Sequence, residues 1–229
     1  MRVDQLLVAC ALLSHLSACG GDSGEIAAAF SDREIIADFA NEVVVPTYGL
    51  LATRVAELDT AVDALAADPS ADGLTAAQRA WVAARVPWEQ SEGFLFGPVE
   101  TFGYDPALDS WPVNKTDLDA VLAAGSEFSE PYVGSLQETQ KGLHTVEYLL
   151  FGAGKQKTAP ELTQRELDYL RAITKELETT SAALSAHWKD SVDGRTPYAQ
   201  VLANAGRPGN TTYPSLVAAV QEILDGMVG

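Results

Sequence analysis

Apolar side chains recur at steps of three and four residues along this 229-residue chain, and no other feature constrains its fold as strongly. That spacing places apolar residues on one face of an α-helix. No segment alternates apolar and polar residues over the length of a strand. The pattern therefore predicts an all-α fold, an up-and-down helical bundle with kinked helices.

The first two predicted helices are each interrupted by a proline. The first covers 36–65, and Pro46 should kink it because proline lacks a backbone donor. The second should begin at Thr75, which forms a capping-box pattern with Gln78. Pro87 should bend this second helix before Gly-Pro ends it at 97–98.

A long connection rich in Gly, Pro and aromatic residues follows over 97–115. Its length exceeds that of a tight turn, so it is either functional or wrapped on the bundle. Further helices are predicted over 116–124, 135–151, 161–189 and 216–227.

The first eighteen residues have the pattern of a lipoprotein signal peptide. Arg2 precedes a compact apolar run over 6–13, and Leu-Ser-Ala leads directly into Cys19. The run is too short to span a bilayer. We expect residues 1–18 to be cleaved, Cys19 to be lipidated, and 19–31 to form a tether that holds the folded part at a membrane of the cell envelope, the outer membrane being favoured.

Charge and cysteine content narrow the possible functions. The chain has 15 Lys and Arg against 32 Asp and Glu, a net charge of −17. Such a surface repels nucleic acid and draws cations toward a concave site. After cleavage Cys10 is lost and Cys19 is lipidated, so no thiol remains for a disulfide, a zinc site or a nucleophile.

The residues most suited to chemistry are His144 and Glu147. They stand three positions apart on a predicted helix, so both side chains can reach one cation. Gly142, close by on the same segment, has no side chain to obstruct that approach. One nitrogen with several oxygen donors suits iron, zinc, manganese or copper. The structural alternative is a buried histidine hydrogen-bonded to a neighbouring carboxylate.

Glu92 is the first candidate for a further ligand. With helical spacing it shares an apolar face with Trp81, Arg85 and Trp88, where an unpaired carboxylate is costly. The alternatives are an ion pair between Arg85 and Glu92 or stacking of the guanidinium on Trp88. Glu89 is placed to form a surface pair with Arg85.

Other polar and aromatic residues are assigned weaker or structural roles. His187 lies near the end of the predicted helix over 161–189, where its charge would complement the helix dipole. Asp105 and Asp109 are weaker candidates for further ligands, because acidic loop residues are usually solvated. The core is the expected place for the larger aromatic side chains, which are Trp81, Trp88, Phe94, Phe96 and Trp111.

Three separated stretches resemble the imelysin-like family. They are WVAARVPWEQSEGFLFGP at 81–98, DSWPV at 109–113 and GLHTVEYLLFG at 142–152. The last contains the family signature Gly-x-His-x-x-Glu. The resemblance extends over 32–227, within a domain assigned to 32–229. The family includes insulin-cleaving membrane proteases, iron-regulated protein A and periplasmic components of iron transporters.

The resemblance implies that His144 and Glu147 form the metal or active-site pair, with Glu92 and Arg85 near the same pocket. Family members run well beyond this chain, so we expect part of the pocket wall, and some ligands, to be absent.

Three functions compete. The first is a lipid-anchored protein that binds iron, or zinc or copper, for uptake and acts with an iron permease or another envelope protein. The second is a metallopeptidase that uses His144 and Glu147; it is disfavoured because Tyr148, not a second histidine, follows Glu147. The third is a non-metal module that recognises an envelope polymer or partner.

Overall fold

In the computed structural model, residues 31–228 can be described, and all the regular structure in that range is helical. The only β-type contact there is an isolated bridge between Val192 and Arg195. The predicted all-α fold is confirmed. The predicted signal peptide, Cys19 and all but the last residue of the predicted tether lie outside the described residues.

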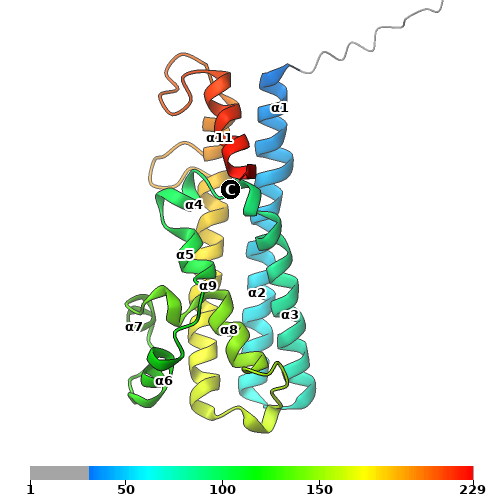
Figure 1. Ribbon diagram of the computed structural model, residues 1–229, viewed down its shortest axis with the longest axis vertical. Coiled ribbons are helices and arrows are strands. Elements are labelled where there is room, and N and C mark those ends of the chain that lie inside the picture. The colour runs from blue at the N-terminus through cyan, green and yellow to red at the C-terminus, as the bar shows by residue number, and fades with distance from the viewer. Residues whose placement is uncertain (1–30, 229) are drawn as a thin grey trace, which may run out of the picture. The chain divides into compact units, whose positions relative to one another are not determined.

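Three long helices form the centre of the bundle: α2 (Val45–Ala67), α3 (Ala71–Gln90) and α9 (Gln164–Lys189). They run side by side, and α2 contacts both of the others along its length (Figure 1). The inner face of α9 is buried as its sequence predicts, at Leu167, Leu170, Leu177, Leu184 and Trp188.

The first helix is irregular at Pro46 rather than simply kinked. Helix α1 (Asp32–Asp38) runs into a π-helical turn (Phe39–Val44), which continues directly into α2. In that turn the N–H of Val45 donates to the carbonyl of Ala40, five residues earlier. Pro46 has no N–H to give, so the hydrogen-bond ladder shifts by one residue there.

The stretch 32–67 is also long and apolar enough to cross a membrane by length and composition alone. Its regularly spaced apolar side chains are fully buried in the bundle, as at Tyr48, Leu51 and Val55. A buried core helix has the same length and apolar composition. These two properties are therefore weak evidence for a membrane span.

The predicted start of the second long helix is wrong. Ser70, not Thr75, caps α3, and its side chain accepts from the N–H of Gly73. Thr75 lies inside the helix and donates its hydroxyl to the carbonyl of Ala71. Serine is the stronger cap, and it directly follows the Asp-Pro that ends α2.

The end of α3 also differs from the prediction. The helix passes through Pro87 but stops at Gln90, and a 3₁₀ turn (Glu92–Phe94) follows. Helical spacing is lost between Trp88 and Glu92, so Glu92 is exposed and does not share the face that carries the tryptophans.

The long connection is wrapped on the bundle as short helices, α4 (Pro98–Thr101) and α5 (Tyr104–Asp109). Helix α6 (Lys115–Ala123) agrees with the predicted helix over 116–124, and α7 (Glu130–Gly134) follows it. The remaining helices are α10 (Tyr198–Ala203), which the periodicity did not indicate, and α11 (Leu216–Val228).

The predicted helix over 135–151 is broken at its centre. A 3₁₀ turn (Glu138–Gln140) precedes α8 (Gly142–Phe151), and Gly142 has a φ of +78°. A Cβ atom at Gly142 would lie 2.8 Å from the carbonyl oxygen of Leu108. Glycine therefore lets the start of α8 approach the backbone of α5 closely, and α8 also contacts α3 and α9.

Candidate functional site

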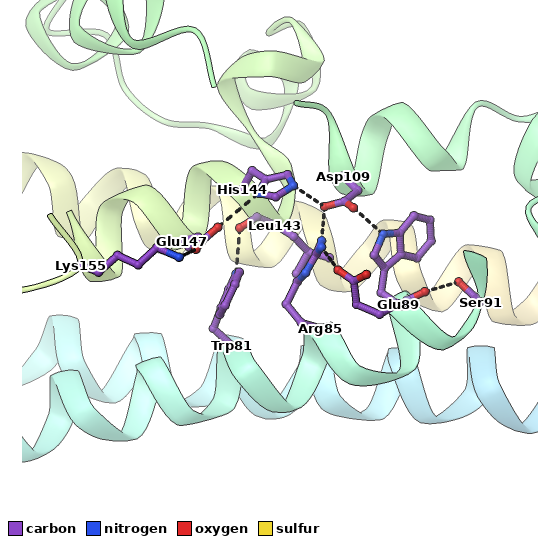
Figure 2. Close-up of polar contacts among 10 residues, drawn as sticks. Trp81, Arg85, Glu89, Ser91, Asp109, Leu143, His144, Glu147 and Lys155 are labelled. Carbon is purple, nitrogen blue, oxygen red and sulfur yellow. Dashed lines mark hydrogen bonds and ion pairs between the residues drawn. The ribbon is translucent and has the colours of Figure 1, made fainter. Parts of the chain in front are cut away.

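The candidate site lies where α3, α5 and α8 meet, and one carboxylate joins the three helices. Asp109 is the last residue of α5. Its Oδ2 accepts a hydrogen bond of 2.7 Å from the indole Nε1 of Trp88 on α3. Its Oδ1 pairs with the guanidinium of Arg85 and lies 3.3 Å from Nε2 of His144 on α8 (Figure 2).

His144 stands between two carboxylates. Its Nδ1 lies 3.2 Å from Oε2 of Glu147, and its Nε2 faces Asp109. The side chains of His144, Glu147 and Asp109 are between 12% and 20% exposed, so they are shielded but reachable. A proton on Nε2 would face Asp109 and would leave the Nδ1 lone pair directed toward Glu147.

Arg85 is held by carboxylates from two directions. It pairs with Glu89 one turn later on α3, as the sequence predicts, and with Asp109. Its guanidinium carbon lies 6.0 Å from the ring centre of Trp81, not over Trp88 as considered from the sequence. Trp88 is fully buried and makes the hydrogen bond to Asp109 instead.

The indole of Trp81 fixes α3 to α8. Its Nε1 donates to the carbonyl of Leu143, the residue before His144, at 2.8 Å (Figure 2). The ring also packs edge-on against Phe151, with centroids 5.4 Å apart. Trp81 therefore contacts the helix that carries the histidine at both its first and its last turn.

An open cavity of about 690 Å³ adjoins the site. Glu147 and His144 form part of its wall, and Lys155 lies 3.2 Å from Oε1 of Glu147. The remaining lining residues are mostly aromatic, apolar or basic, with the acidic Glu89 among them, and they include Trp81, Arg85, Trp111, Pro112, Val113, Lys115 and Tyr148.

Sequence reasoning missed three features of the site. Asp109, only a weaker candidate from the sequence, is central to the site because it contacts Arg85, His144 and Trp88. Trp111 is not core: it is 70% exposed, and its ring centre lies 4.7 Å from that of His144. Lys155 and Lys115 had no sequence signal at all.

Glu92 does not line this cavity. It stands in the turn after α3, and its pKa is raised by desolvation and by the charges of Asp105 and Asp109, with Arg85 acting in the opposite direction. In residues 31–228 no group of three or more His, Cys, Asp and Glu side chains is arranged to hold a metal ion. The predicted trio of His144, Glu147 and Glu92 is thus not brought together.

His187 lies in a different cavity. Its ring stacks on Phe102 with centroids 4.2 Å apart, and its Nδ1 lies 2.7 Å from the hydroxyl of Tyr104. That cavity shares no lining residue with the cavity of His144. Among the described residues, His144 is therefore the one imidazole at the candidate site.

Fold and site together define an all-α bundle protein with a single histidine held between two carboxylates in an open cavity. The chain belongs to the imelysin family, whose family model matches residues 44–229. It is 34% identical to iron-regulated protein A of Synechococcus elongatus over its full length of 229 residues. That match covers 59% of the relative.

Two solved structures share the fold. The iron-regulated protein A precursor of Parabacteroides distasonis superposes with a TM-score of 0.75 at 30% identity, over 83% of this chain and 54% of that one. An imelysin-like protein from Psychrobacter arcticum superposes with a TM-score of 0.68 at 15% identity, over 86% and 58%. The chain thus spans between one half and three fifths of the length of these relatives.

Proposed function

We propose that this protein is a cell-envelope lipoprotein that captures a transition-metal ion, iron in the first place, through His144 and Glu147. One observation carries the proposal: an imidazole nitrogen and a carboxylate oxygen face each other at 3.2 Å in a cavity open to solvent. Nitrogen with oxygen is a donor pair that iron, zinc and copper accept.

The surroundings of the pair fit a metal ligand in one further respect. Histidines that bind metals almost always direct the other ring nitrogen to a carboxylate or carbonyl, which fixes the tautomer. Asp109 has that position on His144. Trp88 and Arg85 in turn hold Asp109, and Gly142 lets α8 come close enough to meet it.

Within residues 31–228, the donor set is limited to two side chains. Glu92 lies outside the cavity, so the proposal rests on His144 and Glu147, with Lys155 as a competitor for the Glu147 carboxylate. Lys155 is 75% exposed, and an exposed pair of this kind is weak. It can therefore give way to a cation.

We propose capture rather than catalysis. Zinc peptidases combine two histidines and a carboxylate ligand with a glutamate base. His187 would have to supply the second imidazole, and it lines another cavity. The iron-regulated name of the relatives supports a role in iron supply. Anchoring through Cys19 and delivery to an envelope permease complete the proposed role.

Metal titration of the full chain in detergent tests the proposal. Anaerobic calorimetry with Fe²⁺, and with Zn²⁺ in parallel, should give one site per chain. His144→Ala and Glu147→Gln should each weaken binding at least tenfold, because each removes one of two donors. His187→Gln is the matched control and should bind like the parent. Equal affinity of parent and His144→Ala would refute the assignment.

A further inference from the structure

The cavity around His144 and Glu147 has the size of a small-molecule site. At about 690 Å³ it falls within the range typical of ligand pockets, roughly 300–1,000 Å³. An ion with six waters takes roughly 180 Å³, because a water molecule occupies about 30 Å³ in the liquid. A bare or hydrated ion would leave most of this cavity unfilled.

The aromatic and apolar residues that line the cavity favour a planar, partly apolar ligand. Trp111 projects into solvent with 70% of its surface exposed, directly beside the imidazole of His144. Trp81, Tyr148 and Val113 continue the same wall. An indole left uncovered next to a polar pair is a surface on which a planar ligand can stack.

The basic residues of the wall indicate that the ligand is an anion. Arg85, Lys115 and Lys155 line the cavity of a chain whose net charge is −17. The acidic side chains of Glu89 and Glu147 line it too. Lys155 pairs with Glu147 and becomes free to meet an anion only when that carboxylate binds the metal. Arg85 is neutralised by Glu89 and Asp109. Lys115 is not: within residues 31–228 no carboxylate lies within 4 Å of its Nζ, which stands 5.1 Å from the Tyr148 ring centre.

The coordination of the ion also indicates that a second molecule shares the cavity with it. His144 and Glu147 fill two positions, and the described residues bring no third donor to them. Iron and zinc ordinarily take four to six ligands. The remaining positions are open to oxygen atoms of a molecule that occupies the rest of the cavity.

From these observations we infer that the protein takes the metal as a complex with a planar organic oxyanion, an aromatic hydroxy acid, rather than as the free ion. The inference rests on the proposed function and names its ligand class. The aromatic ring lies against Trp111, the ammonium groups of Lys115 and Lys155 neutralise the anion, and His144 and Glu147 complete the coordination of the metal.

The test compares three ligands on the full chain in detergent: Ga³⁺ alone, Ga³⁺ with 2,3-dihydroxybenzoate, and Ga³⁺ with citrate. Gallium is inert to redox chemistry, and citrate is an anionic chelator without a ring. Quenching of tryptophan fluorescence and equilibrium dialysis give the affinity. We expect the dihydroxybenzoate complex to bind at least tenfold more tightly than either other ligand.

Variants separate this inference from the proposed function. Trp111→Ala and Lys115→Gln should each weaken binding of the dihydroxybenzoate complex about tenfold and leave binding of Ga³⁺ alone unchanged. His144→Ala should abolish both. Phe102→Ala and Lys189→Gln, an exposed aromatic and an exposed lysine away from the cavity, are the matched controls and should change neither.

Each outcome decides one of the two statements. If Ga³⁺ alone binds as tightly as its complex and depends on His144, capture stands and the inference of a planar chelate is overturned. If citrate binds as well as dihydroxybenzoate, the planar class is wrong. If dihydroxybenzoate binds without metal and independently of His144, the inference is overturned, and titration with the metal alone still decides capture.

Discussion

The indole Nε1 of Trp88 donates a hydrogen bond of 2.7 Å to Oδ2 of Asp109, and this bond ties the end of α5 to the middle of the bundle. The other oxygen of the same carboxylate faces Arg85 and His144. A buried core residue thus sets the position of the carboxylate that orients the candidate metal ligand.

Trp88→Phe should therefore affect both stability and binding. The change keeps a buried aromatic ring but removes a hydrogen bond to a charged group, which costs about 1.5–3 kcal/mol. With Asp109 free to turn, metal affinity should fall about tenfold, as is typical when a partner of a ligating histidine is lost. Urea unfolding and metal titration measure the two effects.

Trp188→Phe is the control for the loss of ring volume. Trp188 is also fully buried, but its Nε1 has no hydrogen-bond partner within residues 31–228. The same substitution there removes no hydrogen bond and should cost clearly less stability. If the two variants are equally destabilised, the bond to Asp109 contributes nothing measurable.

Gly142→Ala should push α8 away from α5. A Cβ atom at this position would lie 2.8 Å from the Leu108 carbonyl oxygen, and its φ of +78° is itself strained for alanine. We expect a loss of about 2–4 kcal/mol, since strain of this kind costs 1–3 kcal/mol before the clash is added. Metal affinity should fall as His144 moves from Asp109.

Gly103→Ala separates the two causes. Gly103 has a φ of +67°, but a Cβ atom there would meet nothing within 4 Å. It should lose only the conformational term, about 1–2 kcal/mol, and should keep its metal affinity. A Gly142→Ala variant no worse than Gly103→Ala would show that the close approach of α5 and α8 is not required.

Periodicity was sufficient to predict the long helices, because each buries a regular apolar face along its length. The buried inner face of α9 and the burial of Trp88 both follow from this spacing of apolar residues. Helix ends were not predictable in the same way, because a single residue can decide where a helix begins or stops. Ser70 rather than Thr75 caps α3. Helical spacing is lost after Gln90, so Glu92 lies outside the site.

The candidate site was predicted where its residues are close in sequence and missed where they are distant. His144 and Glu147 share one helix, and their contact follows from a spacing of three. Asp109 reaches His144 through a tertiary contact between two helices that only the backbone of Gly142 permits. No local pattern encodes such a contact, so Asp109 resembled an ordinary acidic loop residue.

Asp59→Asn should change how stability depends on pH. Asp59 is buried and accepts from the Thr174 hydroxyl at 2.9 Å, and desolvation raises the pKa of its carboxyl above 3.8. Between the unfolded and folded pKa values the folded chain binds more protons. The contribution of Asp59 to stability therefore decreases as pH rises through this window and stays low above it.

Asparagine keeps the acceptor for Thr174 and removes the buried charge. We expect Asp59→Asn to match the parent near pH 3.5 and to be more stable than the parent at pH 7, where the desolvation cost is fully present and exceeds the attraction of Lys175. Urea unfolding at both pH values measures the difference. Asp63→Asn, an exposed neighbour paired with Arg171, should not stabilise the protein at pH 7. A parent more stable than Asp59→Asn at pH 7 would contradict the assignment.

Lys141→Met tests the ion pair that precedes the histidine helix. Lys141 is 4% exposed, lies 2.9 Å from Glu176 on α9 and 3.5 Å from Glu138, and is the residue before Gly142. Its loss leaves a partly buried carboxylate without a counter-charge, and breaking a buried pair costs 3–5 kcal/mol. Since Glu176 is 18% exposed, we expect a loss of about 2–3 kcal/mol.

The double variant Lys141→Met/Glu176→Gln identifies the cause of that loss. Removing the stranded charge should restore part of the stability, so the double variant should be more stable than Lys141→Met alone. Lys175→Met, whose lysine is 68% exposed and pairs with Glu178 and more distantly with Asp59, should cost less than about 1 kcal/mol. If Glu176→Gln adds its own loss to that of Lys141→Met, the two residues act independently, and the start of α8 is held by packing rather than by this pair.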